Sequence, residues 1–195
     1  MTKTKTSAIG LRISILLASL LLQACGQPRI GHENRYIDHG DETVTDTETG
    51  LMWMRCALGQ VWIDDSCKGE AQRYTWLHAM VAAKEHRFAG YDDWRLPDIE
   101  ELKGLVYCSS GEPRYTGLRH RPNVDFIDIE LCEGDYERPT IDQAVFPDTP
   151  ASFFWSASPY AGNSDYAWVV LFYYGDDNWL NRSNGYRVRL VRGGQ

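Results

Sequence analysis

The side chains best suited to metal chemistry lie between positions 38 and 54, in the stretch DHGDETVTDTETGLMWM. Carboxylate oxygens are ligands that calcium prefers, and five acids fall within eleven positions here: Asp38, Asp41, Glu42, Asp46 and Glu48. An EF-hand loop needs oxygen ligands at its first, third and fifth positions and glycine at the sixth. Counting from Asp38 or from Asp41 puts no glycine at the sixth position. We therefore predict turn acids between short strands and no resident metal or cofactor, with a calcium site of another type as the alternative.

A basic group within residues 109–152 is the second candidate for binding chemistry. Arg114, Arg119, His120 and Arg121 lie close together in the sequence. Because guanidinium groups suit carboxylate, sulfate or phosphate, an acidic glycan would be expected to bind here first. The alternative is ion pairing with the acids that follow: Asp125, Asp128, Glu130 and Glu133.

Aromatic residues near the C-terminus form the third candidate. Tyr160, Tyr173, Tyr174 and Trp179 offer flat rings on which sugar rings can stack. In a sequence this rich in β-prone residues, burial of the same rings in the core is the alternative. We take Tyr160 and Trp179 together with Arg114, Arg119 and Arg121 as the predicted ligand-binding residues.

Catalytic motifs give little support for an enzyme. The sequence contains no G-x-S-x-G, H-E-x-x-H or P-loop pattern. The adjacent acids Glu100 and Glu101, or Asp92 and Asp93, are the nearest approach to the carboxylate pair of a glycosidase. Neighbouring acids on a helix or turn point in different directions, so we predict no catalytic residue, with a glycan hydrolase as the alternative.

The N-terminus has the pattern of an export signal. Lys3, Lys5 and Arg12 precede the apolar run at 13–22, which is too short to span a membrane, and Leu22-Gln23-Ala24-Cys25 resembles the lipobox of bacterial lipoproteins. We predict a signal peptide over 1–24, lipidation of Cys25, a tether over 25–34 and one domain over 35–194. An ordinary signal peptide is the alternative. Gly26 stands where retention at an inner membrane uses aspartate, which favours the outer membrane.

The remaining cysteines predict disulfides. Setting aside Cys25 leaves an even number in an oxidising compartment: Cys56, Cys67, Cys108 and Cys132. Of the three possible pairings, Cys56–Cys67 with Cys108–Cys132 closes the shortest loops, and we predict that pairing. No C-x-x-C pair is present, which disfavours the alternative of a zinc site.

The charge balance excludes one class of partner. Removing residues 1–24 takes away three cations and no acid, which leaves 17 Lys and Arg against 27 Asp and Glu, a net charge of −10. Such a surface repels nucleic acid at long range, so we expect no nucleic-acid partner.

Local patterns predict short strands around two helices. Tight hairpins are expected over 35–54, and strands at 153–158, 166–173, 179–181 and 186–191. One helix should begin after Thr75, place Trp76, Leu77, Met80, Val81 and Phe88 on its apolar side, and stop at Gly90. A second should begin at the capping box of Asp98 and Glu101 and end near Tyr107. Residues 109–152 hold five of the eight prolines and predict a long irregular excursion.

Six ordered motifs carry a family resemblance: TVTDTETGLMW, TWLHA, DDWRLPDIEEL, FWSAS, AWVVLF and YRVRLVRGG. Together they resemble the domain at the C-terminus of the Legionella collagen-like adhesin, over about residues 35–194. That family is similar to the C-type-lectin-like fold of formylglycine-generating enzymes. The resemblance implies an α+β fold with two helices, a twisted antiparallel sheet and a long loop, and it implies surface adhesion.

Departures from the relatives limit what the resemblance carries over. This chain has no collagen stalk, and its charge of −10 is wrong for a polyanionic ligand. Glu112-Pro113-Arg114 is the nearest match to the calcium-dependent sugar tripeptide of lectins, and arginine cannot ligate calcium. No cysteine follows Cys132, so the copper-binding pair of the oxidising relatives is missing. We predict a lipid-anchored envelope module that binds a glycan or another envelope protein; a carbohydrate-active enzyme and a structural envelope component are the alternatives.

Overall fold

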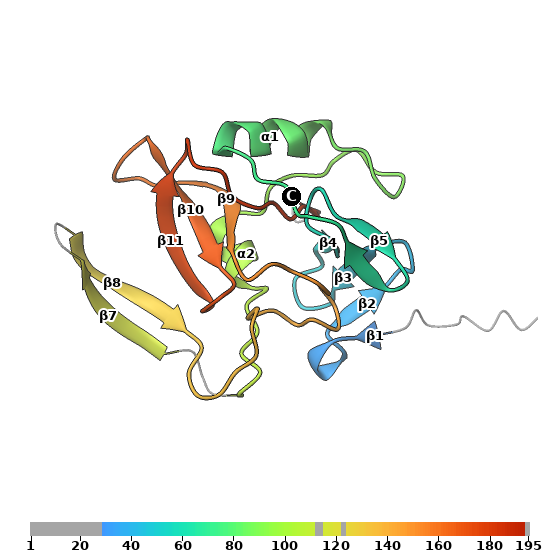
Figure 1. The fold of residues 1–195 in the computed structure, drawn as a ribbon, viewed down its shortest axis with the longest axis horizontal. Coiled ribbons are helices and arrows are strands. Elements are labelled where there is room, and N and C mark those ends of the chain that lie inside the picture. Colours follow the sequence, from blue (N-terminus) through green and yellow to red (C-terminus); the bar gives the residue numbers. More distant parts are fainter. Residues whose placement is uncertain (1–28, 112–114, 122–123, 194–195) are drawn as a thin grey trace, which may run out of the picture.

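The acid-rich stretch folds as the predicted meander of short antiparallel strands. The structure is a computed structural model that describes residues 29–111, 115–121 and 124–193, with the backbone alone for residues 29, 115–121 and 124–131. The first sheet has the strand order β1-β2-β3-β4-β12 (Figure 1). Its strands are β1 (Arg29–Ile30), β2 (Tyr36–Asp38), β3 (Thr43–Asp46), β4 (Met52–Met54) and β12 (Val191–Arg192).

The folded part begins before residue 35. β1 pairs with β2, and a short 3-10 helix, η1 (His32–Asn34), connects them. Ile30 packs against the core cluster that contains Tyr36 and Val145. Residues 29–34, placed in the tether by the sequence, therefore contact the folded part, and Ile30 packs against its core.

A second sheet carries the C-terminal strands. β9 (Phe153–Pro159), β10 (Tyr166–Leu171) and β11 (Asp176–Asn181) are antiparallel in the order β11-β10-β9. β10 is central, as its apolar residues on both faces predicted. The last predicted strand differs: Arg187 forms a bridge with Phe154 of β9, whereas Val191 pairs with Trp53 of β4. The chain end thus links the two sheets instead of closing one.

The two helices cover opposite faces of the second sheet. α1 (Trp76–Glu85) and α2 (Ile99–Lys103) are both present, and Figure 1 shows them on either side of β9 and β10. Val170 and Phe172 share a core cluster with Leu102 of α2. Ala167 and Val169 share the other cluster with Ala79 and Ala83 of α1. Side chains alternate across a strand, so β10 contributes to both cores.

The predicted apolar side of α1 is wrong in its middle, although Trp76 and Phe88 pack against the core. The helix buries Ala79 and Ala83, whereas Leu77, Val81 and Met80 are 66, 45 and 37% exposed. Small alanines let the helix backbone approach the sheet closely, which leaves the larger side chains outside. The helix also ends at Glu85 rather than near Gly90, because His86 is extended and both Ala89 and Gly90 have positive φ.

α2 begins as predicted and is shorter than predicted. Asp98 accepts a hydrogen bond from the Glu101 backbone, and the Glu101 carboxylate accepts one from the Asp98 backbone, so the capping box is complete. The helix ends at Lys103, and Leu105 and Val106 continue the buried stripe in a turn beyond it.

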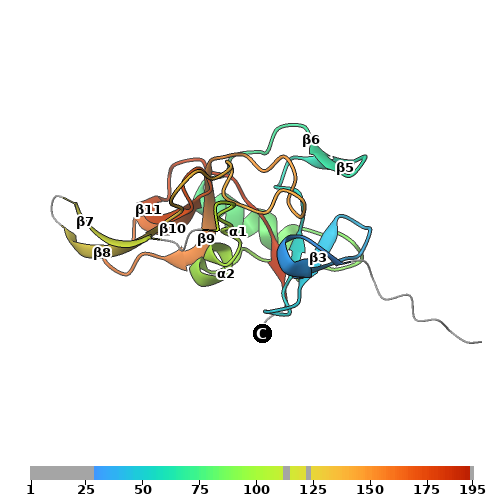
Figure 2. The ribbon, with the colours of Figure 1, turned by 90° about the horizontal axis from the view of Figure 1, so that it is seen from below.

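The excursion contains a hairpin that the sequence did not predict. β7 (Tyr115–Arg121) pairs with β8 (Val124–Leu131), and the hairpin projects from one end of the molecule in both views (Figure 1, Figure 2). None of the five prolines lies within either strand, so no ladder donor is lost. The proline density of the whole segment concealed these two proline-free strands, which Pro122 separates in the sequence. Residues 132–152 remain irregular.

Two disulfides join the predicted pairs. Cys56 and Cys67 have Cα atoms 5.4 Å apart beside the hairpin of β5 (Val61–Ile63) and β6 (Ser66–Lys68). Cys108 and Cys132 have Cα atoms 5.3 Å apart and close the base of the β7–β8 hairpin. Local pairing is thereby supported. No helix within the described part of the chain is long and apolar enough to cross a membrane.

Candidate functional site

Most residues of the sequence motifs make contacts that stabilise the fold. Asp46 is buried and accepts hydrogen bonds from the Arg35 guanidinium, from the Glu48 backbone and from the Thr49 hydroxyl. Arg95 binds both oxygens of Glu101 at 2.7 Å and thereby links the segment before α2 to the helix. These side chains have their partners within the fold, so a ligand site must be sought elsewhere.

The aromatic residues at the second sheet provide such a site. Tyr160 and Trp179 stack in parallel, with ring centroids 4.6 Å apart and an interplanar angle of 4°. Trp168 meets both rings edge-on, at 5.7 Å from Tyr160 and 5.4 Å from Trp179. All three side chains are half-buried. We call Tyr160, Trp168 and Trp179 the aromatic cluster.

Strand register brings the aromatic cluster together. Trp168 of β10 pairs directly with Trp179 of β11, and Tyr166 pairs with Asn181 two positions along the same face. Ala167 and Val169 point to the α1 side, so Trp168 lies on the face that α2 partly covers. Tyr160 comes directly after the last residue of β9, and its ring stacks on the ring of Trp179. Three separate segments therefore contribute one ring each.

A glycine makes room for the Tyr160 ring. A Cβ atom at Gly162 would lie 2.7 to 2.8 Å from two carbons of that ring and from its hydroxyl oxygen, closer than real Cβ contacts. Any larger residue at 162 would therefore push the ring from its stacked position. The structure thus brings the predicted residues Tyr160 and Trp179 into contact. Trp168 is the residue of the aromatic cluster that the sequence patterns did not predict. Trp168 lies between Ala167 and Val169, whose side chains are buried on the other face of β10. This alternation was the signal that the sequence offered.

Tyr173 and Tyr174 do not join the aromatic cluster. They lie at the turn between β10 and β11, 41 and 46% exposed, with rings edge-to-face at 4.6 Å. The Arg138 guanidinium lies over Tyr173 at 4.9 Å and over Tyr136 at 4.4 Å. The four predicted rings therefore do not form one platform. Tyr173 and Tyr174 lie at the turn of the β10–β11 hairpin, whereas Tyr160 and Trp179 stack away from that turn.

The predicted basic residues lie in or next to the β7–β8 hairpin. Arg119 and Arg121 belong to β7, and their side chains are outside the described part of the structure, as are Arg114 and Cys25. β8 contacts β11, and the Cys132 backbone donates a 3.1 Å hydrogen bond to Tyr174. The base of the hairpin is thus fixed beside the strand that carries Trp179.

Charged groups border the aromatic cluster on the α2 side. Asp177 lies two residues from Trp179 on the same face of β11, and its carboxylate is 3.3 Å from the Lys103 amine. Lys103 also lies 3.9 Å from Glu100, whose side chain is 80% exposed. The border therefore offers carboxylate acceptors and one amine donor beside the stacked rings.

One acid of each candidate carboxylate pair, Glu101 in the first and Asp93 in the second, is held by an arginine. Burial favours a raised pKa for Glu101, but hydrogen bonds from Arg95 and from the Asp98 backbone outweigh it and lower the pKa. A hydrogen bond from Arg192 lowers the pKa of Asp93. A general acid needs a carboxyl group that keeps its proton near neutral pH, and these shifts run in the opposite direction.

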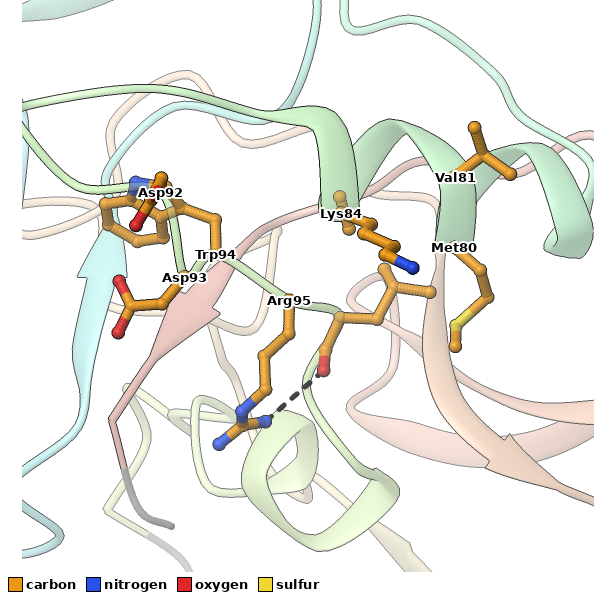
Figure 3. A pocket seen from close by; sticks show the side chains of 9 residues that line it. Met80, Val81, Lys84, Asp92, Asp93, Trp94 and Arg95 are labelled. Atoms are coloured by element: carbon orange, nitrogen blue, oxygen red, sulfur yellow. Dashed lines mark hydrogen bonds between the residues drawn. The ribbon is translucent and has the colours of Figure 1, made fainter.

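A shallow groove of about 470 Å³ lies between α1 and the segment 92–96 (Figure 3). One side of the groove is formed by α1, which contributes Met80, Val81 and Lys84. Asp93 and Arg95 lie on the other side. Asp93 is paired with Arg192, and Arg95 donates to Glu101 and to the carbonyl of Leu96. The groove is therefore a mostly apolar surface on whose border Asp93 and Arg95 are already paired within the fold.

The acids between 38 and 48 have individual roles. Asp38 pairs with Arg55 at 3.0 Å, and Asp46 binds Arg35. Burial raises the pKa of Glu42 to about 6, although a hydrogen bond from the Trp62 backbone opposes the shift. Across the described residues, no three His, Cys, Asp or Glu side chains are grouped so as to hold a metal ion.

Comparison with known proteins identifies one related family. The family model described as "Lcl C-terminal domain" matches residues 42–192. This range includes every residue of the aromatic cluster and both disulfides. No curated protein and no solved structure matches the chain.

Proposed function

Because the chain belongs to the Lcl C-terminal domain family, we propose that it is a bacterial cell-envelope module that binds a glycan without catalysis. The observation that carries the proposal is the parallel stack of Tyr160 on Trp179 with Trp168 edge-on. Sugar rings present patches of C–H groups that pack on aromatic faces. Rings already held in place lose little conformational entropy when a ligand binds.

The surroundings of the cluster support a glycan over a wholly apolar ligand. Asn181 and Asp177 lie on the same face of β11 as Trp179 and carry oxygen acceptors for hydroxyl groups. The β7–β8 hairpin beside β11 carries Arg119 and Arg121 in its first strand. An aromatic floor flanked by polar groups is the usual composition of a small-molecule site.

The cellular setting belongs to the same proposal. Export by residues 1–24, lipidation at Cys25 and location at the outer membrane follow from the leader pattern, and the two disulfides suit an oxidising compartment. A C-type-lectin-like arrangement is proposed for the fold on the same family resemblance. Mass spectrometry of the protein from its native membrane should find Cys25 as a lipid-modified N-terminus.

The decisive experiment is a glycan-array screen of the protein from residue 26 onwards, with and without calcium. For a glycan that binds, Trp179→Ala and Tyr160→Ala should each weaken affinity about tenfold, equivalent to about 1.4 kcal/mol. Tyr174→Ala is the matched control, because it removes an exposed ring of the same hairpin outside the cluster. Full affinity in both cluster variants, with circular dichroism unchanged, would refute the site.

The same glycan distinguishes binding from catalysis. Incubation with the wild-type protein and analysis of the products should return the glycan intact. Released sugar that disappears in Glu100→Gln would favour the carbohydrate-active enzyme instead, since Glu100 is the exposed acid of its pair.

A protein partner is the second candidate, and one observation favours it. Leu77, Val81 and Met80 are exposed on α1 beside the groove of Figure 3. Contiguous exposed apolar side chains often mark protein–protein contacts. If the glycan screen fails, cross-linking from α1 in intact envelopes should identify a partner, and Leu77→Gln with Val81→Gln should abolish that cross-link.

A further inference from the structure

A second pocket, of about 360 Å³, lies between Arg187 and the segment that precedes α1. Its walls are Glu70, Ala71, Gln72 and Arg73 on one side and Arg187 on the other. It shares no residue with the aromatic cluster or with the groove beside α1. The pocket therefore has to be explained on its own.

Arg187, in the wall of this pocket, is held in place by its backbone and by its side chain. Its backbone N–H donates to Phe153 and its carbonyl accepts from Trp155, both at 3.0 Å, so β9 fixes the main chain. One terminal nitrogen, Nη1, donates to the Ala71 carbonyl. The residue is only 8% exposed, so the guanidinium cannot move far from this position.

The guanidinium keeps donors that nothing in the described structure accepts. Nη2 has Glu70 Oε1 as its nearest acidic oxygen, at 3.8 Å, which is too long for a hydrogen bond. Nε is buried and has no hydrogen-bond partner among the described residues. Because Nε has no accessible surface, Nη2 is the nitrogen that a ligand in the pocket can reach, and an anionic oxygen closer than that of Glu70 would satisfy it.

The rim adds further donors. Tyr74 donates its hydroxyl to Gln72 Oε1 at 2.7 Å, which leaves the amide N–H groups of Gln72 for another acceptor. Arg73 is exposed and lines the same pocket. Glu70 is the opposing group, but its side chain is 89% exposed and therefore surrounded mainly by solvent.

We propose that this pocket binds the carboxylate of a small organic acid. The carboxylate would take the place towards which Glu70 now points, and accept from Arg187 Nη2, the Gln72 amide and Arg73. Glu70 acts as an internal competitor, because its own carboxylate approaches the same nitrogen. Long-range repulsion by the acidic surface is screened beyond about 10 Å at 0.1 M salt, so it does not exclude such a ligand.

Titration of ¹⁵N-labelled protein, from residue 26 onwards, with glucuronate, N-acetylglycine and glucose tests the proposal. The two carboxylates should shift the resonances of Gln72 and Arg73 saturably, whereas uncharged glucose should not. A preference for glucuronate would identify a sugar acid as the source of the carboxylate, and a preference for N-acetylglycine would identify a peptide terminus. Equal shifts with glucose, or none with either acid, would overturn the proposal.

Surface variants keep the test independent of folding. Arg73→Gln should weaken carboxylate binding about fivefold, and Glu70→Gln should strengthen it by a similar factor. Arg187→Gln should weaken it at least about tenfold, because a charge-assisted hydrogen bond is lost. Arg87→Gln, an exposed arginine outside the pocket, is the control and should change nothing. Unchanged affinity in both Arg73→Gln and Glu70→Gln would refute the site even if Arg187→Gln fails to fold. Because Trp179→Ala removes no pocket residue, it should leave carboxylate binding intact whatever its effect on glycans.

Discussion

At the scale of single residues, Arg189 shows how a buried positive charge is stabilised without a carboxylate partner. Arg189 is fully buried and donates to the carbonyls of Met54 and Arg55 and to the Thr149 hydroxyl. Burial lowers the pKa of its guanidinium to about 9, which still leaves it charged at neutral pH. The positive charge is thus held by carbonyl dipoles and the Thr149 hydroxyl.

Glu42 is the residue for which pH should change stability. Its folded pKa of about 6 lies above the usual 4.5, so folding favours its protonated form. The stabilisation is fully present below pH 4.5 and is lost as the pH rises through 6. We expect Glu42→Gln, which stays neutral, to match the wild type at pH 4.5 and to exceed it by about 1 kcal/mol at pH 7.5.

Urea unfolding of both proteins at the two pH values measures this difference. Glu48→Gln is a suitable control, because the Glu48 side chain is 67% exposed in the same acidic stretch. A Glu42→Gln variant that is less stable than the wild type at pH 7.5 would show that the ionised carboxylate is favourable where it lies.

At the scale of elements, α1 shows how packing overrides hydrophobicity. Its fully buried residues are Ala79 and Ala83, which share one core cluster with Trp155 and Val169. Leu77 and Val81 have greater apolar surface and are nevertheless outside. The distance between helix and sheet is set by the smallest residues at the contact, and a larger residue there would force the layers apart.

Substitutions on the exposed side of α1 should therefore change the stability little, whereas a larger residue on its buried side should lower the stability. Leu77→Gln and Val81→Gln should each change the free energy of unfolding by less than about 0.5 kcal/mol. Ala79→Leu should cost about 1 to 3 kcal/mol, because the core has no space for the added atoms. Chemical denaturation measures all three, and a large loss in Leu77→Gln would mean that α1 buries its other side.

At the scale of the whole molecule, the two disulfides fix the two hairpins that lie outside the main sheets. Cys56–Cys67 belongs to the β5–β6 hairpin at one end, and Cys108–Cys132 closes the β7–β8 hairpin at the other (Figure 1). Two sheets joined by the chain end form the body between them. Each bridge thus stabilises a different end of the molecule.

Removal of either bridge should destabilise the protein by about 3 kcal/mol on the chain-entropy model. Cys108→Ser with Cys132→Ser should also speed hydrogen exchange in β7–β8 and at the β10–β11 turn, where Cys132 donates to Tyr174. Cys56→Ser with Cys67→Ser serves as the control and should leave exchange there unchanged. Equal exchange in both double variants would show that the second disulfide does not hold the hairpin.

The sequence by itself determined the features that depend on near neighbours. The capping box of Asp98 and Glu101, the hairpins of the acid-rich stretch, the central position of β10 and the pairing of cysteines over short loops were all readable from local patterns. The two proline-free runs of the excursion, 114–121 and 123–138, were readable too, and averaging over the whole segment concealed them. Each of these depends on interactions within a few tens of residues.

Tertiary structure alone decided which side chains meet. The buried side of α1, the separation of Tyr173 from Tyr160, and the carbonyl partners of Arg189 all depend on elements distant in the chain. Trp168 joins the aromatic cluster because strand register sets it opposite Trp179 and a third segment brings Tyr160. Local patterns state what a residue can contact, but the packing of remote segments selects the contact that it makes.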